Sequence, residues 1–169
     1  MPSQPASRAD LMAYLAQLGI ATTCVEHPAV FSVAESDAIE RDLPGGHTKN
    51  LFLRDAKGQL FLIVAEAHTK VDLKSLYKRL GCARLSFGRP DLLMTTLGVT
   101  PGSVTAFAVL NDPTGQVRIV LDRALLAHDV INCHPLTNTA TTSISREDLL
   151  RFFQATAHDP TVLPLDSAQ

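Results

Sequence analysis

The spacing of apolar residues switches between a helical and an extended period along the chain. After Ser7, which forms a capping pattern with Asp10, leucines recur on one helical face as far as Gly19, so a helix is predicted there. Residues 21–26 are typical of a short strand, and the capping pattern Ser-Val-Ala-Glu at 32–35 predicts a second short helix.

The middle of the chain contains two hairpin signals. In each, a polar turn that ends in a glycine, Gly58 or Gly115, lies between two apolar runs, and glycine allows the positive φ that tight turns need. The paired runs are 51–54 with 60–65 and 106–110 with 117–121. Both pairs are expected to form antiparallel strands.

Three more helices are predicted from their caps. Asp72 and Gly81 bracket one helix, Pro90 opens another, and Ser145 caps the last. A further strand is expected at 130–133, and the tail from residue 158 is expected to be weakly ordered.

These elements predict a single α+β domain of mixed α/β layers. Because helices and hairpins interleave, we expect a central mixed, mostly antiparallel sheet flanked by helices. The 169 residues fit one domain and show no internal repeat or linker. The domain is expected to span 1–169, with its core at about 8–157.

Composition changes this picture little. No apolar run reaches the length of about 18 residues that a membrane span needs, and the polar N-terminus lacks a secretory signal. Three scattered cysteines without a CxxC pair argue against disulfides and against a thiolate zinc site. A cytoplasmic location is therefore expected.

Charge is unevenly distributed although the net charge is only −2. Residues 41–90 hold ten of the fifteen Lys and Arg and carry +6, whereas the rest of the chain carries −8. This asymmetry is compatible with a basic face that binds RNA, and equally with separate solvated faces.

The common catalytic and cofactor motifs are absent from the sequence. There is no GxSxG, GxGxxG or GxxxxGK[ST] string, and the six histidines show no HExxH or paired metal-ligand spacing. We expect neither a cofactor nor a metal, with a site of scattered histidines as a minor alternative.

Three polar segments remain as candidates for chemistry. In the first, Lys49 can hold a phosphate and Asn50 offers a donor and an acceptor just after a glycine pair. The second, 133–143, gathers an imidazole, an amide and five hydroxyls. In the third, backbone N–H groups of Gly102 and Ser103 could bind a carbonyl oxygen. From spacing alone, ordinary turns and solvated loops remain the simpler interpretation.

Four strings occur in a fixed order through this chain. They are HTKNLFLRD at 47–55, GVTPGSVT at 98–105, NDP at 111–113 and HPLTNTATT at 134–142. In that order they resemble the YbaK/prolyl-tRNA synthetase editing-domain superfamily, and its free-standing ProXp-ala/PrdX branch in particular. The resemblance spans roughly residues 8–155.

The resemblance implies roles for single residues. Lys49 would contact a phosphate near the tRNA 3′ end beside Asn50, and His134 would position the terminal adenosine and the aminoacyl ester. The family's Gly-x-x-x-Pro loop aligns with 102–106, where Ala106 stands in place of the usual proline. Candidate walls of the amino-acid pocket are Ile20, Val30, Phe31, Ala106, Thr137 and Asn138.

The implied activity is removal of alanine from mischarged proline tRNA, a translation-fidelity reaction. A bound water would hydrolyse the ester, aided by the ribose hydroxyl and by the Gly102 and Ser103 backbone. The expected partner is the acceptor end of aminoacylated proline tRNA, with prolyl-tRNA synthetase or an elongation factor as an open further partner. Alternatives are a deacylase for cysteine, serine or threonine, a non-catalytic tRNA- or synthetase-binding module, and a hydrolase of small acyl esters.

Overall fold

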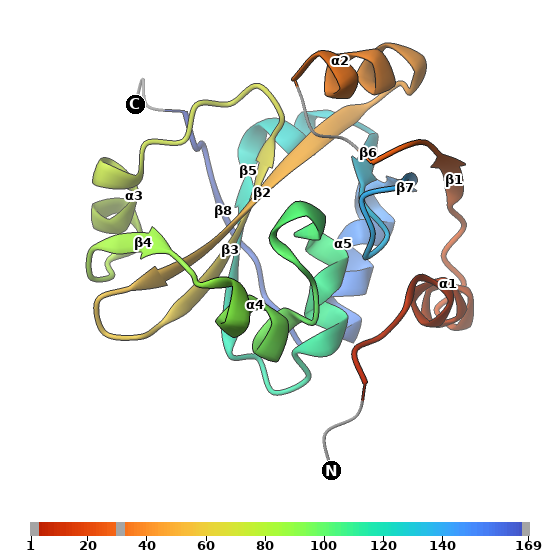
Figure 1. Ribbon diagram of the computed structural model, residues 1–169. Helices are drawn as coiled ribbons and strands as arrows, with labels where there is room; N and C mark the ends of the chain where they lie inside the picture. Colours follow the sequence, from red (N-terminus) through yellow and green to blue (C-terminus); the bar gives the residue numbers. More distant parts are fainter. Residues whose placement is uncertain (1–3, 30–32, 167–169) are drawn as a thin grey trace.

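An eight-stranded mixed sheet organises the computed structural model, which describes residues 4–29 and 33–166 (Figure 1). The strand order is β1-β7-β6-β2-β3-β5-β8, and β4 pairs with β2. The strands are β1 (Thr23–Glu26), β2 (Gly46–Asp55), β3 (Leu60–Glu66), β4 (Leu85–Phe87), β5 (Val117–Asp122), β6 (Val130–Cys133), β7 (Ala140–Ser145) and β8 (Thr161–Leu163). The predicted mixed α/β sheet domain is confirmed.

Five α-helices and three short 3₁₀ helices connect these strands in the described residues. The α-helices are α1 (Arg8–Gln17), α2 (Val33–Asp42), α3 (Leu73–Leu80), α4 (Pro90–Leu97) and α5 (Arg146–Ala155). The 3₁₀ helices are η1 (Pro101–Ser103), η2 (Ala106–Asn111) and η3 (Arg123–Ala127). No helix in the described ranges is long and apolar enough to cross a membrane.

The predicted caps form as the sequence indicates. Ser7 makes the full capping box with Asp10, and Ser145 accepts from the backbone of Asp148. Gly81 adopts the left-handed conformation that ends α3, with φ of 68°. The capping pattern predicted at 32–35 begins at a residue outside the described range.

The sheet separates two apolar cores because β3 is buried on both faces. Its alternate residues Leu62 and Val64 belong to the larger cluster, which α1, α4 and α5 cover. Phe61 and Ile63 belong to a smaller cluster under α3. In the larger cluster the Phe152 ring meets the Phe107 ring edge-on at 5.3 Å between centroids, which fixes α5 against η2.

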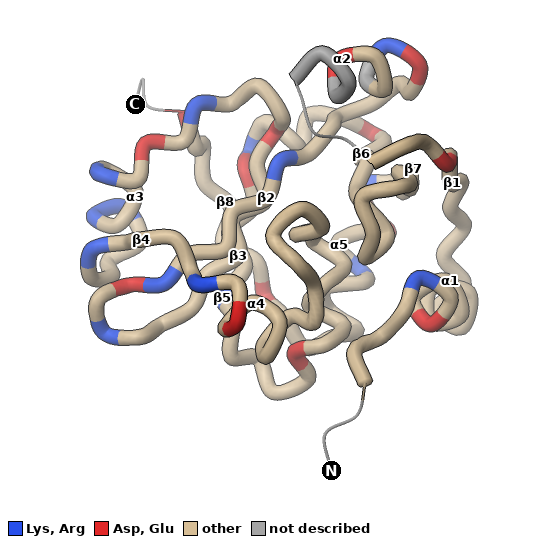
Figure 2. Tube along the Cα trace, viewed as in Figure 1, with Lys and Arg blue, Asp and Glu red and all other residues tan. Residues whose placement is uncertain are grey.

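Basic residues gather at one end of the molecule. Figure 2 shows Lys and Arg around α3, β4 and the turn between β2 and β3. Lys57, Lys74, Lys78 and Arg84 are exposed there. Part of the basic window of the sequence therefore forms one surface, which we call the basic surface and define by these four residues.

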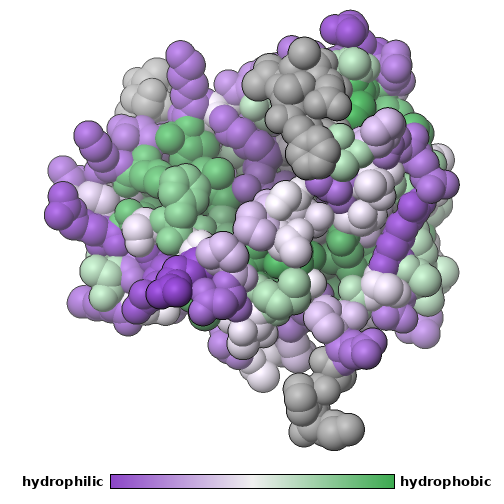
Figure 3. Space-filling model, in the orientation of Figure 1, coloured by the Kyte–Doolittle hydropathy of each residue, from purple (hydrophilic) through white to green (hydrophobic). Residues whose placement is uncertain are grey.

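The smaller core is less completely covered than the larger one. Leu51, Leu73 and Leu85 pack against it but stay only half-buried. Figure 3 shows this apolar area at the surface on the left of the view, between hydrophilic side chains. The basic surface is thus not purely polar.

The second predicted hairpin is wrong. Residues 106–110 form part of the 3₁₀ helix η2 instead of a strand, and β5 pairs in parallel with β3. Four successive residues from Ala106 to Val109 are completely buried, so this apolar run has no polar face. A short run of that kind does not distinguish a strand from a buried helical segment. The sequence analysis also missed β7.

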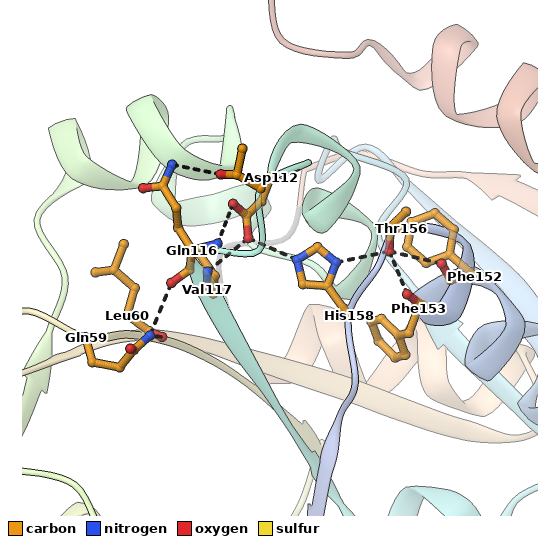
Figure 4. A network of polar contacts seen from close by, with 10 residues as sticks. Gln59, Leu60, Asp112, Gln116, Val117, Phe152, Phe153, Thr156 and His158 are labelled. Carbon is orange, nitrogen blue, oxygen red and sulfur yellow. Dashed lines mark hydrogen bonds and ion pairs between the residues drawn. The ribbon is translucent and has the colours of Figure 1, made fainter.

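The prediction of a weakly ordered tail is also wrong for residues 158–166. His158 is buried and its Nε2 lies 2.9 Å from Oδ2 of Asp112, while its Nδ1 meets the Thr156 hydroxyl (Figure 4). The Asp112 carboxylate also accepts from the backbone of Gln116 and Val117. After this contact the chain continues into β8, which pairs with β5.

Candidate functional site

The middle of β2 has an open edge. On the side away from β3, β2 pairs with β6 only at Gly46 and His47, and with β4 only from Leu53 to Asp55. Residues 48–51 therefore have no strand partner on that side among the described strands. We call this stretch the open edge.

Backbone groups of β2 point into the open edge. His47 accepts from Ala67 and Asp55 donates to Gln59, so odd-numbered residues of β2 make the hydrogen-bonded pairs with β3. Even-numbered residues therefore direct their N–H and C=O away from β3. The N–H of Asn50 is thus available to a ligand at this edge.

Lys49 and Asn50 lie on opposite faces of the sheet, because successive strand residues alternate. Lys49 shares a face with Leu51 and Leu53, which pack in the smaller core under α3. Asn50 shares a face with Phe52, which packs in the larger core. The two predicted site residues therefore flank the open edge from its two sides.

Neither side chain has a partner within the described part of the chain. Lys49 makes no hydrogen bond or ion pair with described residues and is only half-buried. The Oδ1 atom of Asn50 is buried without a hydrogen bond to any of them. An unsatisfied buried acceptor costs about 1–3 kcal/mol, so Asn50 favours a ligand that donates to it.

A small pocket of about 60 Å³ lies beside the start of β2. A water needs about 10–15 Å³ on this scale, so the pocket has room for a group of only a few non-hydrogen atoms. Its lining residues come from α2, β2, β6 and β7 and the segments that follow β3 and β6: Ile39, His47, Thr48, Ala67, Asn132, Cys133, His134 and Thr141. Of the predicted site residues, His134 is the one that lines it.

His134 is held by its ring and by its backbone. Its Nδ1 lies 3.1 Å from the carbonyl oxygen of Ala140, and its own carbonyl accepts from the Thr105 hydroxyl at 2.6 Å. Burial lowers the pKa of His134, against the Ala140 contact, and the nearby His27 lowers the pKa further. The imidazole is therefore neutral at pH 7.

The Thr105 contact also fixes the glycine loop beside His134. The Cβ of a residue at Gly102 would lie 3.4 Å from Nδ2 of Asn138, so this loop approaches the 134–140 segment closely. The Ser103 N–H already donates to Thr100 at 2.9 Å within η1. Gly102 is the remaining backbone candidate of the predicted pair.

The proposed pocket walls fall in three places. Ile20 and Ala106 are buried in the larger core and are not among the residues that line the small pocket. Thr137 and Asn138 are half-buried in the loop after His134. Val30 and Phe31 lie outside the described residues.

Four lining residues with imidazole, hydroxyl or amide side chains were not assigned a role from the sequence: His47, Thr48, Asn132 and Thr141. Three of them lie within the strings quoted above, so position in those strings was the available signal. Cys133 also lines the pocket, and its complete burial raises the pKa of its thiol to about 12. The thiol is consequently not a nucleophile at neutral pH.

The fold and the site together define a small mixed α/β domain with a pocket and an open strand edge, both lined by backbone and side-chain polar groups. Comparison with known proteins is consistent with this class. Residues 27–152 match the model of the aminoacyl-tRNA editing domain, and the chain belongs to that family.

Individual relatives support the assignment, and a solved structure shares the fold. The chain is 42% identical over 161 residues to prolyl-tRNA synthetase associated domain-containing protein 1 of Danio rerio, covering 94% of this chain and 88% of the relative. It is 40% identical over 146 residues to prolyl-tRNA editing protein ProX of Acetoanaerobium sticklandii, covering 86% and 89%. A crystal structure described as a candidate trans-editing enzyme for prolyl tRNA synthetase shares the fold, with a TM-score of 0.71, 21% identity, and coverage of 96% and 99%.

Proposed function

We propose that this protein is a free-standing deacylase that hydrolyses alanine from mischarged proline tRNA. The observation that carries the proposal is the size and position of the small pocket, about 60 Å³ beside the open edge of β2, in a chain of the aminoacyl-tRNA editing family. Of the two relatives above, one is named a prolyl-tRNA editing protein and the other a prolyl-tRNA synthetase associated domain-containing protein.

The geometry suggests how the acceptor end would lie. The 3′-terminal phosphate would meet Lys49, whose ammonium group has no partner in the described part of the chain. The ester would lie at the open edge, between the backbone of Asn50 and the Gly102 loop. The basic surface would contact phosphates of the acceptor stem, on the same side of the sheet as Lys49.

The chemistry needs no side-chain nucleophile. Water attacks the ester carbonyl carbon, the bond between that carbon and the ribose oxygen breaks, and the proton lost by water is taken up by the ribose oxygen. The N–H groups of Asn50 and Gly102 would stabilise the negative charge that develops on the carbonyl oxygen. The protein's contribution is positioning and electrostatics.

Selection for alanine over proline would be steric. A pocket for a few atoms has room for part of an alanyl group, whereas the pyrrolidine ring of proline, which joins the side chain to the nitrogen, would overpack it at a cost of about 1–3 kcal/mol or more. Serine and cysteine differ from alanine by one atom, so weaker discrimination against them is expected.

The test is time-resolved deacylation of proline tRNA charged with alanine, cysteine, serine or proline. Alanine should be released fastest, and Lys49→Ala should slow release about 10- to 100-fold through loss of a charge-assisted phosphate contact. Lys57→Ala is the comparison variant, because it removes one charge of the basic surface at the far end of the β2–β3 hairpin and should slow release less than Lys49→Ala does. Intact esters with retained tRNA binding would instead identify a non-catalytic tRNA-binding module.

A further inference from the structure

The hydrogen bonds around the small pocket leave its histidines as acceptors. Nε2 of His47 lies 2.9 Å from the carbonyl oxygen of Leu43, and Nδ1 of His134 lies 3.1 Å from that of Ala140. A carbonyl oxygen only accepts, so each of these nitrogens carries the ring proton. In the neutral rings, Nδ1 of His47 and Nε2 of His134 then carry lone pairs and no hydrogen.

The two threonine hydroxyls are committed in the same way. Thr48 donates to the carbonyl oxygen of Asn132 at 2.9 Å. Nδ1 of His27 lies 2.9 Å from the carbonyl of Pro28, so Nε2 of the neutral ring must accept, and the Thr141 hydroxyl donates to it at 2.9 Å. Each hydroxyl has used its hydrogen and keeps lone pairs only.

Asn132, the remaining amide in the lining, also offers no free donor. Its Nδ2 donates to the carbonyl oxygens of Pro44 and Gly46, and its Oδ1 accepts from the Ser143 hydroxyl. The amide therefore fixes the wall and leaves no N–H for a ligand. Among the lining side chains, the Cys133 thiol is the one weak donor, and it is hydrogen-bonded to the Thr48 hydroxyl.

We propose that this pocket binds the α-ammonium group of the aminoacyl ester through the lone pairs of His47, His134 and Thr141. The inference rests on the deacylase function proposed above and specifies which end of the amino acid enters the pocket. An ammonium group is a donor with three hydrogens and no acceptor, the complement of a wall with acceptors and no strong donors. A carboxylate or carbonyl would find no strong side-chain donor here.

Neutral acceptors also suit turnover. None of the eight lining residues is acidic, so the ammonium group is held by hydrogen bonds without a direct ion pair in the pocket. With the ammonium group inside, the ester carbonyl falls at the open edge, where the Asn50 N–H points. The pocket thus acts as a positioning site for the reacting bond.

The experiment compares three esters on the same proline tRNA: alanyl, lactyl and propionyl. They differ at one position, which carries an ammonium group, a hydroxyl or a hydrogen, and so offers three, one or no donor hydrogens. Each enzymatic kcat/KM is divided by the uncatalysed hydrolysis rate of the same ester at the same pH, since the ammonium group itself activates the ester. Normalised rates should fall in that order, with propionyl about 10- to 100-fold below alanyl.

Variants separate the lone pair from the fold. His134→Asn keeps an N–H in the place of Nδ1 for the Ala140 carbonyl but removes the Nε2 lone pair. His47→Gln keeps an N–H in the place of Nε2 for the Leu43 carbonyl but removes the Nδ1 lone pair. Both should shrink the normalised ratio of alanyl to propionyl rates, a change that general destabilisation does not produce. Lys49→Ala should slow all three esters alike and leave that ratio unchanged.

Equal normalised rates for the three esters, with alanyl hydrolysis still fast and lost in Lys49→Ala, would overturn this inference and leave the deacylase function standing. The same holds if His134→Asn keeps the wild-type ratio. If none of the three esters is hydrolysed, the deacylase function fails and this inference falls with it.

Discussion

The basic surface and the small pocket are both polar, but they are built in opposite ways. The basic surface presents four long, exposed side chains, Lys57, Lys74, Lys78 and Arg84. In the pocket, each imidazole and hydroxyl is fixed by a hydrogen bond to the backbone or to a neighbour. The first arrangement favours affinity for a charged polymer, and the second favours selection of one small group.

The largest effect that separates the two regions should be in salt dependence. If Lys74, Lys78 and Arg84 each contact one phosphate, kcat/KM for alanyl-tRNA should fall about 20- to 40-fold between 50 and 200 mM salt through these contacts. The combined change Lys74→Ala, Lys78→Ala and Arg84→Ala should remove most of that slope. Steady-state rates measured across a salt series check this.

A variant in the pocket should behave differently from the triple variant of the basic surface. His134→Asn should lower the rate at every salt concentration while keeping the wild-type slope, because no phosphate contact is lost. A triple variant with the wild-type slope, or a His134→Asn protein with a flat one, would show that the two regions do not divide the work in this way.

A smaller effect is expected from pH. Burial lowers the pKa of His134 below its ordinary value of about 6.5, and the neighbouring His27 lowers it further. The ring is therefore mostly neutral at pH 6.5 and above. Below the lowered pKa the ring gains a proton on Nε2, loses its lone pair and repels an ammonium group. The normalised alanyl rate should therefore be flat near neutrality and fall on the acid side, by up to about tenfold per pH unit.

Propionyl esters provide the control for that profile. Because they carry no ammonium group, their normalised rate should depend much less on the protonation of His134. A parallel acid limb for both esters would place the titrating group elsewhere in the site.

The contrast also explains what could be predicted from the sequence. Caps and turns are local, so Ser7, Asp72 and Gly81 predicted their helix ends correctly. Resemblance indicated Lys49 and Asn50, which lie at the open edge, and His134, which lines the small pocket, and their roles remain predictions. Side-chain alternation along β2, which sets Lys49 and Asn50 on opposite faces, was not predicted, because the predicted strand began at residue 51.

What escaped prediction depends on contacts between distant segments. The role of Thr141 follows from His27, more than a hundred residues earlier in the chain, and the acceptor character of His47 follows from the Leu43 carbonyl. The 3₁₀ helix η2 and the ordered tail arise from burial against other elements, which periodicity within one segment does not report. The hydrogen-bond direction at each pocket group is therefore a property of the fold.

The smallest effect on catalysis is expected at the buried contact between His158 and Asp112. These two residues belong neither to the basic surface nor to the small pocket. His158→Ala removes the Nε2 contact to Asp112 and the Nδ1 contact to Thr156, and should lower the free energy of unfolding by about 1–3 kcal/mol. Asp159→Ala, at the exposed neighbouring residue, is the matched control and should change little. Urea unfolding measures the difference, while the salt slope and the alanyl-to-propionyl ratio should both stay at their wild-type values. A His158→Ala protein of normal stability with an altered ratio would mean that the tail acts on the pocket, and that selection is not confined to the groups that line it.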